Sequence, residues 1–147
     1  SSKRPPEPTA TPSPGYGAQS METRFPEGPN SRLVNLMTIA CHDQTPENNA
    51  AVTEELFNGT AVLLVPTEPA EEGTVGVTFT HVQMIEGKVT LIAFTGEAAV
   101  YSYAKEDILC MGFPSGVLLR RCMENGIGAI VVDPNTPNEV YMGLKAA

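Results

Sequence analysis

The chain holds few residues whose type and spacing are typical of catalysis. Its histidines and cysteines are His42, His81, Cys41, Cys110 and Cys122. Nucleophilic catalysis requires a reactive group, a base within hydrogen-bonding reach and a group that orients the base, and no known catalytic motif pairs His42 or His81 with a cysteine. Phosphate-binding, nucleophile-elbow, zinc-protease and calcium-loop motifs are also missing from the sequence. We therefore predict no catalytic residue, no metal site and no cofactor.

His81 lies in the apolar phase of a predicted strand with Val75, Val77 and Phe79. It could serve as a base or ligand in a cleft, but no second ligand is spaced for a metal, so we interpret it as a hydrogen-bonded structural histidine. The odd number of cysteines, without C-x-x-C spacing, indicates reduced thiols packed as small hydrophobic side chains. Reduced thiols favour a cytoplasmic location. The chain opens without a methionine, which leaves open whether a targeting segment precedes it.

Polar residues at the ends of predicted elements form a second candidate site. Open α/β sheets bind ligands beyond the carboxyl ends of their strands, and helix N-termini offer backbone N–H groups. The residues in such positions are Thr95, Ser115, Gly116, Asp133 and Asn135. One interpretation is a ligand-binding rim. The other is that these residues cap turns and helices, which their types favour.

The hydrophobic pattern predicts the elements that would position this rim. Helical periodicity and capping residues predict helices starting after Asn30-Ser31, at Pro46, after Thr95 and at Ser115, the second of them ending in a left-handed stop at Asn58-Gly59. Strands are predicted at 61–65, 75–80, 88–94, 108–111, 127–132 and 139–144. The 75–80 and 88–94 strands form a hairpin around Glu86-Gly87.

Two of these strands, 61–65 and 127–132, are apolar throughout and are typical of strands buried on both faces. With three or four helices, they predict an α/β fold, a mixed sheet with helices on both faces. A single core should then contain six side chains, those of Val62, Leu64, Ile92, Leu119, Ile130 and Val132.

Composition limits the possible partners. The 147 residues carry a net charge of −8 with only 9 basic side chains, which disfavours nucleic acid. No apolar run is long enough for a membrane helix, so no membrane insertion is expected. Residues 1–29 hold seven of the 13 prolines and predict a disordered tail or linker, followed by one domain at 30–147.

Several segments resemble the N-terminal domain of the SseB family, the enhanced-serine-sensitivity proteins of bacteria. They are Leu63-Leu64-Val65-Pro66, Ala93-Phe94-Thr95, Glu124-Asn125-Gly126 and Ala129-Ile130-Val131-Val132-Asp133-Pro134. The similarity covers roughly residues 47–142 and implies an α/β domain without a catalytic signature. Longer relatives carry a second, C-terminal domain.

We therefore predict a non-enzymatic interaction or regulatory domain that presents a surface to a protein partner, with the tail as a tether. The candidate surface residues are Arg120, Arg121 and Glu124, on the outward side of an amphipathic helix. The alternative is a small-molecule-binding or hydrolytic domain that uses the rim at Thr95, Ser115 and Asp133. Convergence of these polar groups on one pocket would favour the alternative.

Overall fold

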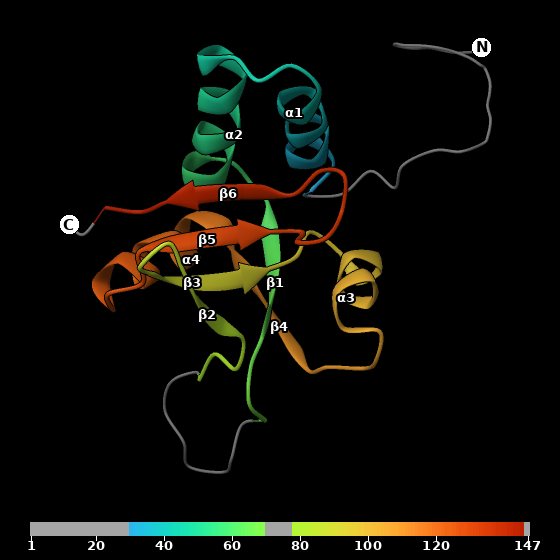
Figure 1. The fold of residues 1–147 in the computed structure, drawn as a ribbon, viewed down its shortest axis with the longest axis vertical. Helices are drawn as coiled ribbons and strands as arrows, with labels where there is room; N and C mark the ends of the chain where they lie inside the picture. Colours follow the sequence, from blue (N-terminus) through green and yellow to red (C-terminus); the bar gives the residue numbers. More distant parts are fainter. Residues whose placement is uncertain (1–29, 70–77, 146–147) are drawn as a thin grey trace. The chain divides into compact units, whose positions relative to one another are not determined.

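The computed structural model describes residues 30–69 and 78–145, so the predicted tail at 1–29 lies outside the described residues. Arg32 and the residues after it form one compact unit, shown in Figure 1. Its elements follow one another as α1 (Ser31–His42), α2 (Pro46–Asn58), β1 (Val62–Pro66), β2 (Val82–Ile85), β3 (Lys88–Ala93), α3 (Glu97–Ala104), β4 (Cys110–Pro114), α4 (Ser115–Glu124), β5 (Ala129–Val132) and β6 (Val140–Gly143).

α1 and α2 form a helical hairpin, and its second helix begins as predicted. The Oγ1 of Thr45 accepts a hydrogen bond of 3.0 Å from the Asn48 N–H, and Pro46 stands in the first turn. This bond satisfies one of the N–H groups that a helix start leaves unpaired. At the other end, Gly59 has a φ of −88°, so the prediction of a left-handed stop is wrong. The Gly59 N–H donates instead to the Glu55 carbonyl at 2.8 Å.

The strands form a four-stranded mixed sheet and a two-stranded sheet. The order of the first is β2-β3-β5-β6, with β3 and β5 parallel and the other neighbours antiparallel. β1 and β4 pair antiparallel in the second. Two hydrogen bonds of 2.8 Å between Leu64 and Phe94 connect β1 to the residue that follows β3. Among the described strands, β6 is an edge of the larger sheet, next to α1 and α2 (Figure 1).

The β2–β3 hairpin turns at Glu86 and Gly87, which have φ values of 51° and 79°. Two successive residues with positive φ are typical of the tight turns that match the twist of antiparallel strands. The turn is where the sequence predicted it, but β2 spans Val82–Ile85 rather than 75–80. Of the predicted strand, residues 75–77 lie outside the described residues, and Phe79 forms only an isolated bridge with Thr67.

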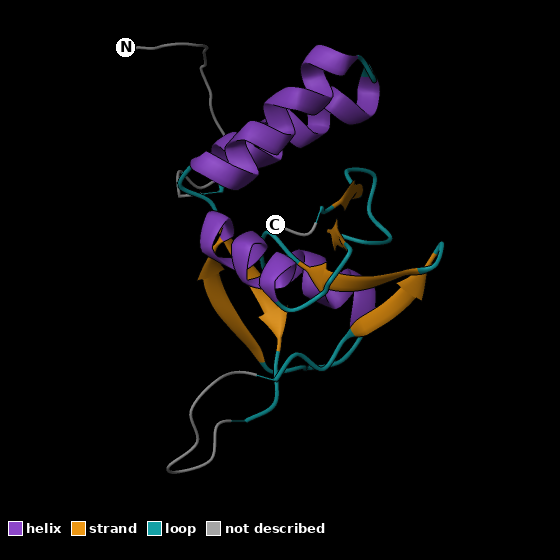
Figure 2. Cartoon of the chain, turned by 90° about the vertical axis from the view of Figure 1, so that its left-hand side faces the viewer, coloured by secondary structure: helices purple, strands orange, loops and turns teal. Residues whose placement is uncertain are grey.

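Two hydrophobic clusters lie on opposite faces of the four-stranded sheet, because alternate residues of a strand point to opposite sides. α1, α2 and α4 pack on the face of Leu91 and Ile130, and α3 packs through Val100 on the face of Ile92. The two helices of the α1–α2 hairpin stay together in both views (Figure 1 and Figure 2). The predicted α/β class, with helices on both faces of a mixed sheet, is confirmed.

The prediction of a single core is wrong, because the six predicted side chains do not all belong to one cluster. Leu119, Ile130 and Val132 belong to the larger cluster, whereas Ile92 belongs to the cluster under α3, where Leu64 packs against it. Val62 is only half-buried. β1 points its other side chains, those of Leu63 and Val65, into the larger cluster.

Candidate functional site

Thr95 and Asp133 lie just beyond the two parallel strands, β3 and β5. Parallel strands end at the same edge of a sheet, so the chain brings these two residues together. The Thr95 N–H donates to Oδ1 of Asp133 at 2.7 Å, and Thr95 Oγ1 donates to Oδ2 at 2.6 Å. The prediction that Thr95 caps α3 is wrong, because the N-cap of that helix is Gly96 and no side chain caps it.

Asp133 is only 6% exposed. Burial raises the pKa of its carboxyl group, and the hydrogen bonds from Thr95 act in the opposite direction. Its backbone has a φ of 55°, in the left-handed region that aspartate tolerates better than most residues. Because both carboxylate oxygens accept hydrogen bonds from Thr95, Asp133 holds the ends of β3 and β5 together.

Asn135 belongs to the turn that follows Asp133. It has a φ of 65°, and its N–H donates to Oε1 of Glu139 at 2.9 Å. The carbonyl of Asp133 accepts a hydrogen bond of 2.8 Å from the hydroxyl of Thr136. These bonds close the turn between β5 and β6, so Asn135 has a structural role beside Asp133.

Ser115 and Gly116 are held at the contact between α4 and α2. The buried Ser115 hydroxyl donates to the Leu56 carbonyl at 2.7 Å. A Cβ on Gly116 would lie 2.5 Å from the carbonyl oxygen of Phe57, so only glycine allows this close approach of two helices. The structure thus groups Thr95, Asp133 and Asn135, and directs the Ser115 hydroxyl to α2.

Three grooves among the described residues are lined by other residues than the predicted rim. A groove beside α3 is lined by Leu64, Glu97, Val100, Tyr101, Asp107, Ile108 and Cys110. The grooves beside α4 and beside β6 are likewise lined by residues outside the predicted rim.

The predicted surface residues lie on α4, and they differ in their surroundings. Arg120 donates to the Phe57 carbonyl at 3.4 Å, which ties it to α2. Arg121 lines a groove of about 540 Å³ together with Asn125, just beyond the end of α4. Glu124 is exposed in the last turn of the helix. Arg121 is therefore the member of this set that borders a concave surface.

The other wall of this groove is apolar and belongs to the β2–β3 hairpin. Val82 and Val89 line the groove. Met84 pairs with Val89, and Val82 pairs with the core residue Leu91, so Met84 lies on the same face of the hairpin, next to the groove. Val82, Met84 and Val89 are nevertheless 41%, 67% and 37% exposed. This groove was not predicted from the sequence, because the first strand of the hairpin was expected before His81. The alternation of Val82, Gln83 and Met84 was the available signal.

The histidine and the cysteines show no catalytic arrangement among the described residues. The His81 ring is 2.9 Å from Thr80 Oγ1 and contacts Tyr103 edge-on. Burial raises the pKa of the Cys110 thiol, and it raises that of Cys122 to about 11. In the described ranges, no cluster of three or more His, Cys, Asp or Glu side chains is arranged to hold a metal ion. None of the helices described is long and apolar enough to cross a membrane.

The sequence of this α/β unit matches a known protein family. Residues 33–143 match the model of the SseB protein N-terminal domain family, and the chain belongs to that family. The resemblance seen in the sequence is thereby confirmed. Comparison with curated proteins gave no match, and comparison with solved structures gave none either.

Proposed function

We propose that this SseB-type domain is a non-enzymatic interaction or regulatory module that binds a protein partner. The main support is the groove beside α4, where the apolar face of the β2–β3 hairpin is exposed next to Arg121. Exposed apolar surface rimmed by polar groups is typical of interaction sites, and arginine and methionine are enriched at interfaces.

The charges around the groove indicate what the partner carries. Arg121 places a guanidinium group at the border of the groove. This basic side belongs to a chain whose net charge is −8. A partner segment with an apolar face and a carboxylate would complement the site, because guanidinium groups bind carboxylates through paired hydrogen bonds.

The alternative, a small-molecule-binding or hydrolytic domain, has less support from the geometry. Ser115 donates to α2, while Thr95 and Asp133 are bonded to each other. A hydrolytic site needs these groups near one reacting atom.

The three free cysteines support a reducing, cytoplasmic location for the domain.

The test compares two surface variants with two controls. Met84→Asp and Arg121→Glu should each weaken capture of the native partner from the source cell, while the thermal midpoint stays near that of the wild type. Lys105→Glu makes the same charge change as Arg121→Glu, at the exposed end of α3, and should leave capture unchanged. His81→Ala should also retain function. Loss of function in His81→Ala alone, at matched stability, would reject the interaction module and favour an enzyme.

A further inference from the structure

The outer edge of β6 offers main-chain groups for an additional strand. The Leu144 N–H donates to the carbonyl of Gly128, the residue before β5, at 2.8 Å. Because main-chain groups alternate in direction along a strand, Val140 and Met142 face β5, while Tyr141 and Gly143 face away from it. Glu139 shares this outward phase, and its carbonyl accepts the Cys41 thiol at 3.6 Å. Within residues 30–69 and 78–145, no hydrogen bond reaches the main chain of Tyr141 or Gly143.

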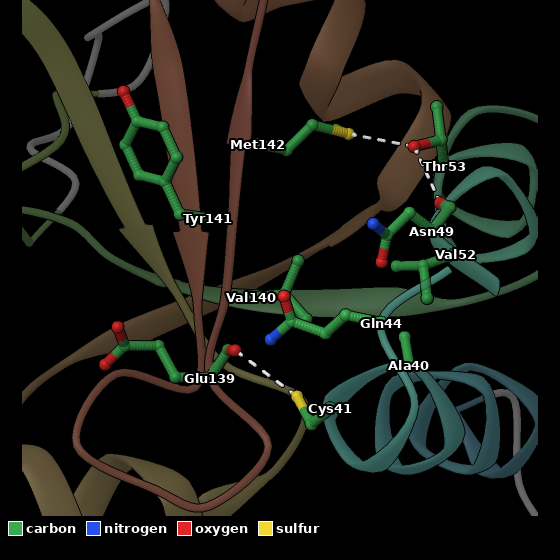
Figure 3. Close-up of a pocket in the computed structure, with 10 residues that line it drawn as sticks. All are labelled: Ala40, Cys41, Gln44, Asn49, Val52, Thr53, Glu139, Val140, Tyr141 and Met142. Carbon is green, nitrogen blue, oxygen red and sulfur yellow. Dashed lines mark hydrogen bonds between the residues drawn. The ribbon is translucent and has the colours of Figure 1, made fainter. Parts of the chain in front are cut away.

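A groove runs between this edge and the α1–α2 hairpin (Figure 3). Its volume is about 270 Å³, and its lining residues are Ala40, Cys41, Gln44, Asn49, Val52, Thr53, Glu139, Val140, Tyr141 and Met142. This volume lies below the range usual for small-molecule sites, about 300–1,000 Å³. One side of the groove is lined by β6 and the residue before it, from Glu139 to Met142. Such a groove is better matched to an extended peptide than to a compact ligand.

The two faces of β6 set different requirements for the side chains of an added strand. Val140 and Met142 point toward the helices, and Met142 accepts a hydrogen bond from Thr53 at 3.7 Å. Figure 3 shows the Tyr141 ring pointing away from them. Glu139 lies two residues before Tyr141 and shares its face. Small apolar side chains therefore fit on the helix side, and basic side chains fit on the side of Tyr141 and Glu139, where they meet a carboxylate and an aromatic ring.

The surrounding charges agree with a basic occupant. The α1–α2 hairpin exposes Asp43 next to the lining residue Gln44. Its Arg32 is already paired with Glu55 at 3.1 Å. At the opposite end of β6, Lys88 Nζ lies 3.2 Å from the position of a Cβ on Gly143. A basic side chain is therefore best placed at the Glu139 end.

We propose that the edge of β6 binds an extended segment of a partner protein, in which small apolar residues alternate with basic ones, by adding it as a further strand. The main chain of Tyr141 would supply the central hydrogen bonds, and Glu139 would pair with a basic side chain. This site and the groove beside α4 are lined by different residues, so an experiment can refute this proposal without refuting the proposed function.

The test uses the whole chain and the peptide acetyl-Val-Lys-Val-Lys-Val-amide as probe. One control peptide has glutamate in place of lysine. Another is methylated at every main-chain nitrogen, the terminal amide included, so that its main chain cannot donate hydrogen bonds. Tyr141→Pro removes the outward N–H at a position where an edge strand tolerates proline. Tyr141→Ala keeps that N–H and removes only the ring. Circular dichroism and the thermal midpoint show whether each variant folds.

We expect the lysine peptide to bind wild type and Tyr141→Ala and to slow amide exchange at Tyr141 and Gly143 in the wild type. The lysine peptide should bind Tyr141→Pro roughly tenfold or more weakly than it binds the wild type, which corresponds to the loss of about one hydrogen bond. The N-methylated peptide should bind the wild type at least that much more weakly than the lysine peptide does. The glutamate peptide should also bind the wild type more weakly. Equal binding of the N-methylated peptide to the wild type would overturn the proposal even if Tyr141→Pro did not fold. Binding mapped to Val82 and Arg121 would also overturn it, as would protection of Tyr141 by self-association of the free protein.

Discussion

The hydroxyl and the amide of Thr95 both donate to the carboxylate of Asp133, at 2.6 and 2.7 Å, across 38 residues of sequence. These bonds join the chain just after the two parallel strands of the larger sheet. Burial of a carboxylate costs free energy unless the carboxylate is hydrogen-bonded, so the two hydrogen bonds from Thr95 should stabilise the folded domain.

Removal of the Thr95 hydroxyl should lower the free energy of unfolding. Thr95→Val keeps the shape and the backbone N–H but leaves one oxygen of the buried Asp133 without its donor. We expect a loss of about 1–3 kcal/mol in the free energy of unfolding, measured by urea denaturation. Thr53→Val, at an exposed site on α2, should cost less than about 0.5 kcal/mol. Equal effects of the two changes would contradict the role of the pair.

The raised pKa of Asp133 predicts a pH dependence of stability. Burial raises this pKa in the folded protein, so the folded state holds the proton more tightly than the unfolded chain does. The resulting stability is fully present below the ordinary carboxyl pKa of about 4 and is lost as pH rises through the raised pKa. Asp133→Asn carries no such charge. Its stability relative to the wild type should therefore improve between about pH 3 and pH 7. Parallel pH curves for the two proteins would refute this.

Leu119 tests the packing of α4 on the larger cluster. It is fully buried, and Leu119→Ala should lower the free energy of unfolding by about 2–5 kcal/mol. Val117 lies on the same helix but is 50% exposed. We expect Val117→Ala to cost less than about 1 kcal/mol. A small loss for Leu119→Ala in chemical denaturation would show that α4 does not pack as described.

Gly116 tests the close approach of α4 and α2. A Cβ there would meet the Phe57 carbonyl oxygen at 2.5 Å, whereas a Cβ on Gly96 would have no atom of its surroundings within 4 Å. Gly116→Ala should therefore destabilise the domain by about 1–3 kcal/mol through overpacking, and Gly96→Ala should cost less than about 1 kcal/mol. Thermal unfolding compares the two, and a reversed order would exclude steric contact as the cause.

The sequence predicted most of the fold because its strongest signals are local. Thr45 and Pro46 specify a helix start through their own chemistry, and the apolar run before Asp133 specifies a buried strand. The position of β2 was missed, because residues 75–80 alternate as clearly as 82–85 do and local pattern does not distinguish them. The boundary between the tail and the domain stays a prediction.

The candidate site was harder to predict because it depends on contacts between distant residues. Thr95 and Ser115 both look like helix caps in the sequence. Pairing of β3 with β5 brings Thr95 to Asp133, and packing of α4 on α2 turns Ser115 toward Leu56. No spacing along the chain indicates either outcome. The groove at Arg121 likewise depends on where β2 lies.

The parallel pairing of β3 with β5 has a consequence for the order of folding. Between these strands the chain must complete α3, β4 and α4, so their pairing closes a long loop and must offset the entropy of that closure. The β2–β3 hairpin closes through two turn residues and can form early. The β3–β5 pair should therefore belong to the late part of the folding reaction, with mutations at Asp133 acting mainly on the unfolding rate.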